Sequence, residues 1–461
     1  MIRRSIFALL ALFALSPISV AFAQSKSQPN NVKPNIIVIM ADDLGYHDLG
    51  FQGSTHIKTP NVDWLAANGT RFTDGHVSAS VCSPSRAGMM TGRYQQRFGH
   101  EANVPKRPHG MDPKERTIGQ ALQGCGYRTA VIGKWHLGDE EHHYPTARGF
   151  DEFWGLREGS RTYWYEAGKG NDKPGNPKNI EHNGKPVAFE GHLTDRMGDR
   201  AVEFIEAESD KPFFVFLSFT APHGPLQSKP EDMAALGTKD NYAGLVYGMD
   251  RNVGKVIQAL KKNKQLDNTM IWFLSDNGGT VKQASNKPLG GKKGTKFEGG
   301  MRVPFVLCWK GKVQPAADYD SMISALDIYP TSVKAAGGSL EQPRPLDGVD
   351  LLPFLNGKQD GKPHEQLYWR KLECAAMRDG NWKMIRVAGL DDHLFNLTND
   401  IAEQKDLASQ NSEQLKRMQG MLKQWEADKI EPIWKEGAVW TKVRYQYHKS
   451  WFETGKAPKS K

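Results

Sequence analysis

The chain has 461 residues, a formal net charge of +9, 38% hydrophobic residues and only four cysteines. This composition is typical of a globular protein, and it excludes a disulfide scaffold because four cysteines are too few for a chain of this length. A chain this long can bury one large core and a smaller appendage. The basic balance predicts an anionic partner, and it leaves open an acidic glycan, nucleic acid or a membrane surface.

The first residues predict a cleavable secretory signal over residues 1–23. Two arginines precede an apolar run over residues 6–20, and residues 21–23 have the small-x-small pattern of a cleavage site. Because the run is short for a membrane span of roughly 20 residues, we expect cleavage rather than an anchor. The sequence therefore predicts a periplasmic or secreted protein without a membrane span, whose mature chain begins near Gln24.

Four short apolar runs predict buried strands of an α/β sheet, since each is nearly continuous in hydrophobic residues and ends at a polar cluster. They span residues 35–40, 129–133, 213–219 and 269–275. The polar residues that follow them are Asp42 and Asp43, Lys134 and His136, His223, and Asp276 and Asn277. Ligands of open α/β sheets bind beyond the carboxyl ends of the strands, so these side chains are predicted to form one composite site.

Between the strands, the clearest helical pattern has hydrophobic residues spaced to occupy one helix face. These residues are Leu245, Met249, Val253, Val256 and Leu260. The segment over residues 168–185 is rich in Gly, Asn, Pro and Lys, which predicts a surface loop. We place a catalytic domain over residues 24–362 and a smaller subdomain over residues 363–461.

The subdomain is predicted to combine a small antiparallel sheet with an amphipathic helix. Its short strand-like segments contain Trp369, Met377, Trp382, Ile385 and residues 394–397, and its helix carries Leu415, Met418, Leu422 and Trp425. An aromatic tail follows, with Trp434, Trp440 and Trp451 among its residues. We expect this tail to pack on the main domain, and a glycan-binding rim is the alternative.

The most specific segment begins with Cys82-Ser83-Pro84-Ser85-Arg86. A cysteine just before a proline that suits a first helical turn would lie near backbone N–H groups that favour anions. Arg86 would add a fixed cation with several donors. From these residues alone, Cys82 could also be a buried thiol or an ordinary cysteine nucleophile of low pKa.

This segment, followed by Thr-Gly at residues 91–92, resembles the modification signature of the type I, formylglycine-dependent sulfatases, and residues 126–136 are similar to their second signature. The resemblance, which extends to bacterial sulfated-polysaccharide sulfatases, implies a sulfuric ester hydrolase. It implies an alkaline-phosphatase-like α/β fold with a large mixed, mainly parallel central sheet and a smaller C-terminal α+β subdomain. It also implies that a formylglycine-generating enzyme converts Cys82 to formylglycine.

The resemblance further implies a metal site. Its ligands would be Asp42, Asp43, Asp276 and Asn277, together with the modified Cys82. An oxygen-only set suits a hard cation, and calcium is favoured over magnesium.

Catalytic roles follow from the same resemblance. Lys134, His223 and Lys293 are similar to sulfate-binding groups, although Lys292 is a rival of Lys293 that the sequence leaves open. In the implied mechanism Asp276 accepts a proton from the hydrated aldehyde, and His223 protonates the leaving group. His136 would assist sulfate release and Arg86 would hold the diol.

The predicted export and basic charge favour a sulfated carbohydrate as the substrate. The resemblance to bacterial sulfatases implies a polysaccharide of the algal carrageenan, ulvan or fucan type. His100 and Arg157 are predicted sugar contacts, and for His100 a local helix-end network is the alternative. We expect no nucleic-acid partner. Two other functions stay open: a phosphomonoester or phosphonate hydrolase of the same superfamily, and an inactive polyanion-binding protein.

Overall fold

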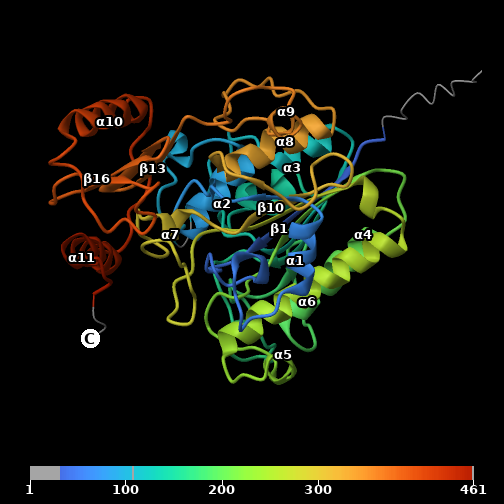
Figure 1. The fold of residues 1–461 in the computed structure, drawn as a ribbon. Helices are drawn as coiled ribbons and strands as arrows, with labels where there is room; N and C mark the ends of the chain where they lie inside the picture. Colours follow the sequence, from blue (N-terminus) through green and yellow to red (C-terminus); the bar gives the residue numbers. More distant parts are fainter. Residues whose placement is uncertain (1–31, 106–107, 459–461) are drawn as a thin grey trace, which may run out of the picture. The chain divides into compact units, whose positions relative to one another are not determined.

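The computed structural model describes residues 32–105 and 108–458 (Figure 1). The signal expected over residues 1–23 lies outside these residues. Within the described part, no helix has both the length and the apolar character that a membrane crossing requires. The four cysteines form no disulfide.

The centre of the fold is a sheet of ten strands in the order β11-β2-β10-β9-β1-β8-β4-β5-β6-β7. The five middle strands are parallel to one another, in the order β9, β1, β8, β4 and β5. This confirms the prediction of a mainly parallel sheet. The bounds of these strands are β1 (Asn35–Ala41), β4 (Arg128–Lys134), β5 (Glu152–Leu156), β8 (Phe213–Ser218) and β9 (Thr269–Ser275). All four strands expected from apolar runs are present, to within one residue at each end.

Shorter strands extend the sheet on both sides. On one side lie β2 (Thr70–Phe72), β10 (Phe305–Cys308) and β11 (Ala317–Tyr319), and on the other β6 (Glu181–His182) and β7 (Lys185–Pro186). β6 and β7 correct the prediction of a plain surface loop over residues 168–185, because β6 pairs antiparallel with β5. A separate pair joins β3 (Gly75–His76) to β12 (Ile323–Ser324).

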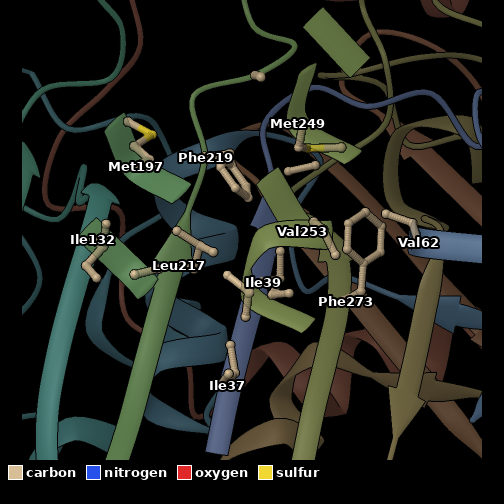
Figure 2. Packing of buried hydrophobic residues seen from close by; sticks show 14 of the residues in the cluster. Ile37, Ile39, Val62, Ile132, Met197, Leu217, Phe219, Met249, Val253 and Phe273 are labelled. Carbon is tan, nitrogen blue, oxygen red and sulfur yellow. The ribbon is translucent and has the colours of Figure 1, made fainter. Parts of the chain in front are cut away.

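Side chains of β1 alternate between two cores, as the pleat of a strand requires. Ile37 and Ile39 belong to the core that contains α4 (Leu193–Glu206) and α6 (Asn241–Lys262). Figure 2 shows these two isoleucines among side chains from the neighbouring strands and helices. The helix face expected from Leu245 to Leu260 is confirmed in α6, where all five residues are buried.

The other face of the sheet carries a second core. Ile36, Val38 and Met40 pack there with residues of three helices, which are α2 (Cys82–Thr91), α3 (Ile118–Gly124) and α8 (Ile328–Ala335). Of the remaining helices, α1 (Pro60–Ala67) and α5 (Pro230–Leu236) contact α6, and the short α9 (Leu352–Leu355) follows α8. The sheet is therefore covered by helices on both faces.

The C-terminal region contains the small antiparallel sheet and the helix that the sequence predicts. The sheet is a meander of β13 (Gln366–Lys371), β14 (Cys374–Asp379), β15 (Trp382–Val387) and β16 (His393–Asn396), and two helices follow, α10 (Ser412–Glu426) and α11 (Ala438–Thr454). Met418 and Leu422 of α10 pack on Met377 and Met384 of the sheet. In Figure 1 these elements form the orange to red end of the chain.

A buried ion network connects this region to α7 and to the separate strand pair of β3 and β12. Glu298, in α7 (Glu298–Met301), accepts hydrogen bonds from Lys383 Nζ at 2.7 Å and Arg378 Nη1 at 3.2 Å. His76 Nε2 lies 3.0 Å from the same carboxylate. The tail also packs on the main domain, since Tyr447 belongs to the same core cluster as Phe297. Contacts group Lys33–Lys461 as one unit, so the boundary at residue 363 stays a prediction.

Candidate active site

Four oxygen-bearing side chains meet where β1 and β9 end. Asp42 and Asp43 follow β1, and Asp276 and Asn277 follow β9, its parallel neighbour. The amide of Asn277 donates to Asp43 Oδ1 at 2.7 Å, and the backbone N–H of Asp43 donates to Asp276 Oδ1 at 3.2 Å. Adjacent parallel strands bring their carboxyl ends together, and this explains how residues more than 230 positions apart come into contact.

Cys82 is the first residue of α2, and it is buried beside these carboxylates. Its Sγ lies 3.6 Å from Asp42 Oδ1 and 3.9 Å from Asp43 Oδ1. Lys293 Nζ approaches the same sulfur to 2.9 Å. A group at position 82 thus lies between two carboxylates and a cation, at the N-terminal end of a helix whose dipole favours negative charge.

Arg86, one turn further along α2, connects the helix to three strand ends. Its Nε and Nη2 both lie 2.9 Å from Asp276 Oδ2. Its Nη1 donates to the carbonyl of Lys134 at 3.0 Å and to Ser218 Oγ at 2.6 Å. Because Arg86 is fully buried, these bonds hold α2 in place against β4, β8 and β9.

Two lysines reach the carboxylates from opposite parts of the chain. Lys134 Nζ, fully buried, lies 2.7 Å from Asp42 Oδ2, and Lys293 Nζ lies 2.5 Å from Asp43 Oδ1. The Nζ of Lys292 lies instead over the ring of Tyr447, 5.4 Å from its centre. Of the two neighbouring lysines that the sequence could not separate, the structure brings Lys293 to the site.

His136 lies in the left-handed region of the backbone, with φ 61°, and so does Asp43, with φ 66°. Non-glycine residues seldom adopt this conformation unless their surroundings impose it. Burial, together with the charges of Lys134 and Arg86, holds the pKa of His136 well below its ordinary value. Its ring is therefore neutral near pH 7, and its buried Nδ1 has no hydrogen-bond partner among the described residues.

His223 is the most exposed group of the site, with 24% of its side chain accessible. Its Nε2 lies 3.7 Å from Asp43 Oδ2, and its Nδ1 lies 2.7 Å from the carbonyl of Gly224. The buried hydroxyl of Tyr163 lies 2.8 Å from the carbonyls of Thr220 and His223 and so supports the segment that carries the imidazole. Sequence reasoning missed Tyr163, and no local pattern marks it.

The charges of the site balance one another. Three carboxylates, from Asp42, Asp43 and Asp276, face three cations, from Arg86, Lys134 and Lys293. Burial raises the pKa of Asp276, but the charges of Arg86 and Lys134 outweigh it and place the pKa below its ordinary value. All three acids are in contact with cations, so a bound divalent cation would give the site a net positive charge suited to an anion.

The donor set fits such a cation. Oxygens of Asp42 and Asp43 lie within 4.8 Å of the sulfur of Cys82 and of His223, close enough to share one ion. The Oδ1 of Asn277 is buried and accepts no hydrogen bond from any described residue. An unsatisfied buried oxygen next to several carboxylates suits a hard divalent ion.

The two expected sugar contacts lie in different surroundings. His100 has no exposed surface, and its Nε2 lies 2.6 Å from Ser83 Oγ, which donates to the carbonyl of His136 at 2.7 Å. This is the local helix-end network rather than a surface that meets a sugar. Arg157 lines a small cavity together with His136, and its Nη2 lies 2.9 Å from Glu181 Oε1.

Comparison with known proteins adds to this geometry. Residues 34–338 match the family model described as sulfatase, and residues 292–429 match the C-terminal model of N-sulphoglucosamine sulphohydrolase. The chain is 34% identical over 400 residues to the uncharacterized sulfatase YdeN of Escherichia coli (strain K12), which covers 73% of this chain and 68% of YdeN.

Two solved structures are similar over most of the chain. One is the crystal structure of Ps i-CgsB in complex with k-i-k-neocarrahexaose, with 38% identity and a TM-score of 0.83, covering 92% of this chain and 100% of the other. The second is the PsFucS1 sulfatase from Pseudoalteromonas sp., with 27% identity and a TM-score of 0.75, covering 86% of this chain and 90% of the other.

Proposed function

This chain belongs to the sulfatase family and is a sulfuric ester hydrolase, and from that premise we propose that it removes sulfate from a sulfated oligosaccharide or polysaccharide. The nucleophile is formylglycine formed from Cys82, and calcium is the bound metal. The observation that carries the proposal is the position of Cys82 Sγ, which contacts Asp42, Asp43 and Lys293 at the start of α2.

Asp42, Asp43, Asp276, Asn277 and the modified residue 82 would hold the calcium ion, with magnesium as the alternative. When bound, calcium supplies positive charge that acidifies a hydroxyl of the hydrated aldehyde and offsets charge on the sulfate oxygens. The residues of the chain supply the remaining groups.

In the first step, the carboxylate of Asp276 accepts the proton of one hydroxyl of the aldehyde hydrate. The oxygen of that hydroxyl forms a bond to sulfur, while the bond between sulfur and the sugar oxygen breaks. Lys134 and Lys293 stabilise the sulfuryl oxygens in the transition state. His223 donates a proton to the departing sugar oxygen as a general acid. Its side chain is the most exposed of the site, which suits a contact with the leaving group.

In the second step, the neutral imidazole of His136 accepts the proton of the remaining hydroxyl. The carbon–oxygen double bond re-forms, the carbon–oxygen bond to the sulfate breaks, and free sulfate leaves. Arg86 holds the hydrate through this step. A serine or cysteine ester would lack the second hydroxyl, which explains the need for a modified residue.

The substrate class rests on the basic charge of the chain and on the similarity to a structure that contains k-i-k-neocarrahexaose. A carrageenan-type saccharide is therefore the favoured substrate, with ulvan and fucan types as alternatives. Arg157, beside His136, is retained as a sugar contact. Periplasmic or secreted location and maturation by a formylglycine-generating enzyme complete the proposal.

The test is to purify the protein from a host that makes a formylglycine-generating enzyme and to determine the mass of the peptide that contains residue 82. Sulfate release is then measured with carrageenan, ulvan and fucan oligosaccharides, and Cys82→Ala is the control. An aldehyde mass together with sulfate release that Cys82→Ala lacks is the expected result. A fully converted protein that cleaves phosphate or phosphonate esters and no sulfate ester would overturn the proposal.

A further inference from the structure

A second group of basic side chains is buried close to the proposed active site. Lys296 lies three residues after Lys293, Lys371 is the last residue of β13, and Arg444 belongs to α11. Lys296 is 1% exposed, and its Nζ has no hydrogen-bond partner among the described residues. Two guanidinium nitrogens of Arg444, Nε and Nη2, likewise have no oxygen acceptor there. We call these three residues the basic cluster.

Among the described residues, one carboxylate forms hydrogen bonds or ion pairs with the basic cluster, and the exposed Glu373 acts on Arg444 through its charge alone. Glu436 accepts a hydrogen bond from Lys371 Nζ at 3.0 Å and pairs with Arg444. The nearby Glu101 is engaged elsewhere, because its Oε1 lies 2.6 Å from Arg370 Nη2. Three cations thus share one carboxylate, and burying an unpaired ammonium is costly. This excess of buried donors suits an oxyanion that comes from outside the chain.

Arg444 is the member of the basic cluster that reaches a surface cavity. Arg444 lines a cavity of about 460 Å³ together with Glu436, Cys374 and Tyr445. Lys296 is buried against the same helix, because its backbone N–H donates to Nε2 of His448 in α11 at 3.0 Å. Burial raises the pKa of Cys374, and the charges of Lys296 and Arg444 oppose this effect. Burial also lowers the pKa of Lys296 itself to about 7, and the charges of Lys371 and Arg444 add to the effect.

The basic cluster is also within electrostatic range of the nucleophile. Burial lowers the pKa of Lys371, and the charges of Arg444 and then Lys293 lower it further. The charge of Cys82 acts in the opposite direction. Gly294, the neighbour of Lys293, faces α11, because a Cβ at this position would lie 3.8 Å from Arg444 Cδ. A saccharide whose first sulfate contacts Lys293 would carry its neighbouring substituents towards this side of the site.

We propose that Lys296, Lys371 and Arg444 bind a second sulfate group of the substrate while the first sulfate is hydrolysed. This inference rests on the proposed function and extends it, since it makes the enzyme selective for saccharides with more than one sulfate. Glu436 already presents carboxylate oxygens to the cluster, and this shows that the cluster accommodates an oxyanion.

The first test compares kcat/KM of the converted, calcium-loaded enzyme for neocarratetraose substrates that carry one or two sulfates per disaccharide. Lys296→Met is expected to lower kcat/KM about tenfold for the doubly sulfated substrate, which corresponds to about 1.4 kcal/mol, and to leave the singly sulfated substrate unchanged. Lys310→Met is the matched control. It removes an exposed lysine that follows β10 and pairs with Asp267.

The second test measures binding without catalysis, by titration calorimetry with sucrose octasulfate. Lys296→Met and Arg444→Gln are each expected to weaken this affinity about tenfold, while Lys310→Met does not. Unchanged affinity in both cluster variants, or equal losses of kcat/KM for both substrates, would overturn the inference. If the wild-type enzyme hydrolyses neither substrate, the proposal of a carrageenan substrate is wrong. The affinities for sucrose octasulfate would still show whether the basic cluster binds sulfate groups.

Discussion

The Nζ of Lys293 lies 2.9 Å from the Sγ of Cys82, yet the thiol is not acidified. Burial raises the pKa of Cys82 to about 12, and the opposing charges of Lys134 and Lys293 do not compensate for it. A nearby cation is the usual means of activating a cysteine. Here the unmodified thiol stays protonated at neutral pH, and this agrees with a site that uses the residue in another chemical form.

The unconverted protein provides the first prediction. At pH 7, iodoacetamide should alkylate Cys82 roughly 10³-fold more slowly than a free cysteine, because only the thiolate reacts and its fraction falls tenfold with each unit of pKa. Peptide mass spectrometry over time measures the rate. The partly exposed Cys125 serves as an internal reference. Alkylation of Cys82 as fast as Cys125 would contradict the raised pKa.

Lys293 and Lys292 form a natural pair for the second prediction. Lys293→Met should lower kcat/KM for a sulfate ester about 10²–10³-fold, since a buried cation that stabilises transition-state charge contributes an effect of this size. Lys292→Met should change it little, because its ammonium lies over Tyr447. The aldehyde content at residue 82 must be measured in both variants. Equal losses at equal aldehyde content would show that both lysines contribute.

The third prediction concerns the leaving group. His223→Ala should slow the release of a sugar alcohol about 10²–10⁴-fold, the range of general-acid catalysis. It should slow 4-nitrophenyl sulfate much less, because nitrophenolate departs without a proton. His136→Ala is the comparison, since a role in sulfate release would slow both substrates alike. A similar loss for both substrates in His223→Ala would remove the general-acid role.

Metal removal is the fourth prediction. A chelator should lower Tm and calcium should restore it, because a ligand present at 100 times its Kd stabilises the folded state by about 2.7 kcal/mol. Asp43→Asn should weaken this response, since it removes one carboxylate from the proposed ligand set. Differential scanning calorimetry with calcium and with magnesium measures the effect. A Tm that responds to neither ion would argue against the site.

Lys296 gives the fifth prediction, through its pKa of about 7. Between pH 7 and about 10.5 the unfolded lysine binds more protons than the folded one, so its contribution makes stability rise with pH. Below pH 7 the folded chain bears the full cost of the buried charge. Lys296→Met should therefore be more stable than wild type at pH 6, by up to about 4–5 kcal/mol, and the difference should shrink towards pH 10.

Urea unfolding at pH 6 and pH 9.5 in buffer without sulfate measures this difference. Lys310→Met should show none, because that lysine is exposed and removing its charge changes no buried group. A Lys296→Met variant that is less stable than wild type at pH 6 would mean that the ammonium has a partner that stabilises it in the folded protein.

The sequence alone determined the strands and the groups at their ends. The run over residues 269–275 predicts β9 because a buried parallel strand must be apolar on both faces, and a single segment carries that pattern. The segment from Cys82 to Arg86 predicts the start of α2, because the residues that begin a helix are neighbours in the sequence. Such features are local, so a reader of the sequence can find them.

The tertiary structure alone decided which side chains meet. The sequence favours Lys293 over Lys292 without settling between them. The turn that carries both lysines directs Lys293 to the site, and the backbone N–H of Lys293 donates to the Gly279 carbonyl at 3.2 Å. His100 is buried behind Ser83. The basic cluster brings together residues 296, 371 and 444, whose contacts depend on how β13 and α11 pack. These contacts depend on packing between residues far apart in the sequence, so no local sequence pattern predicts them.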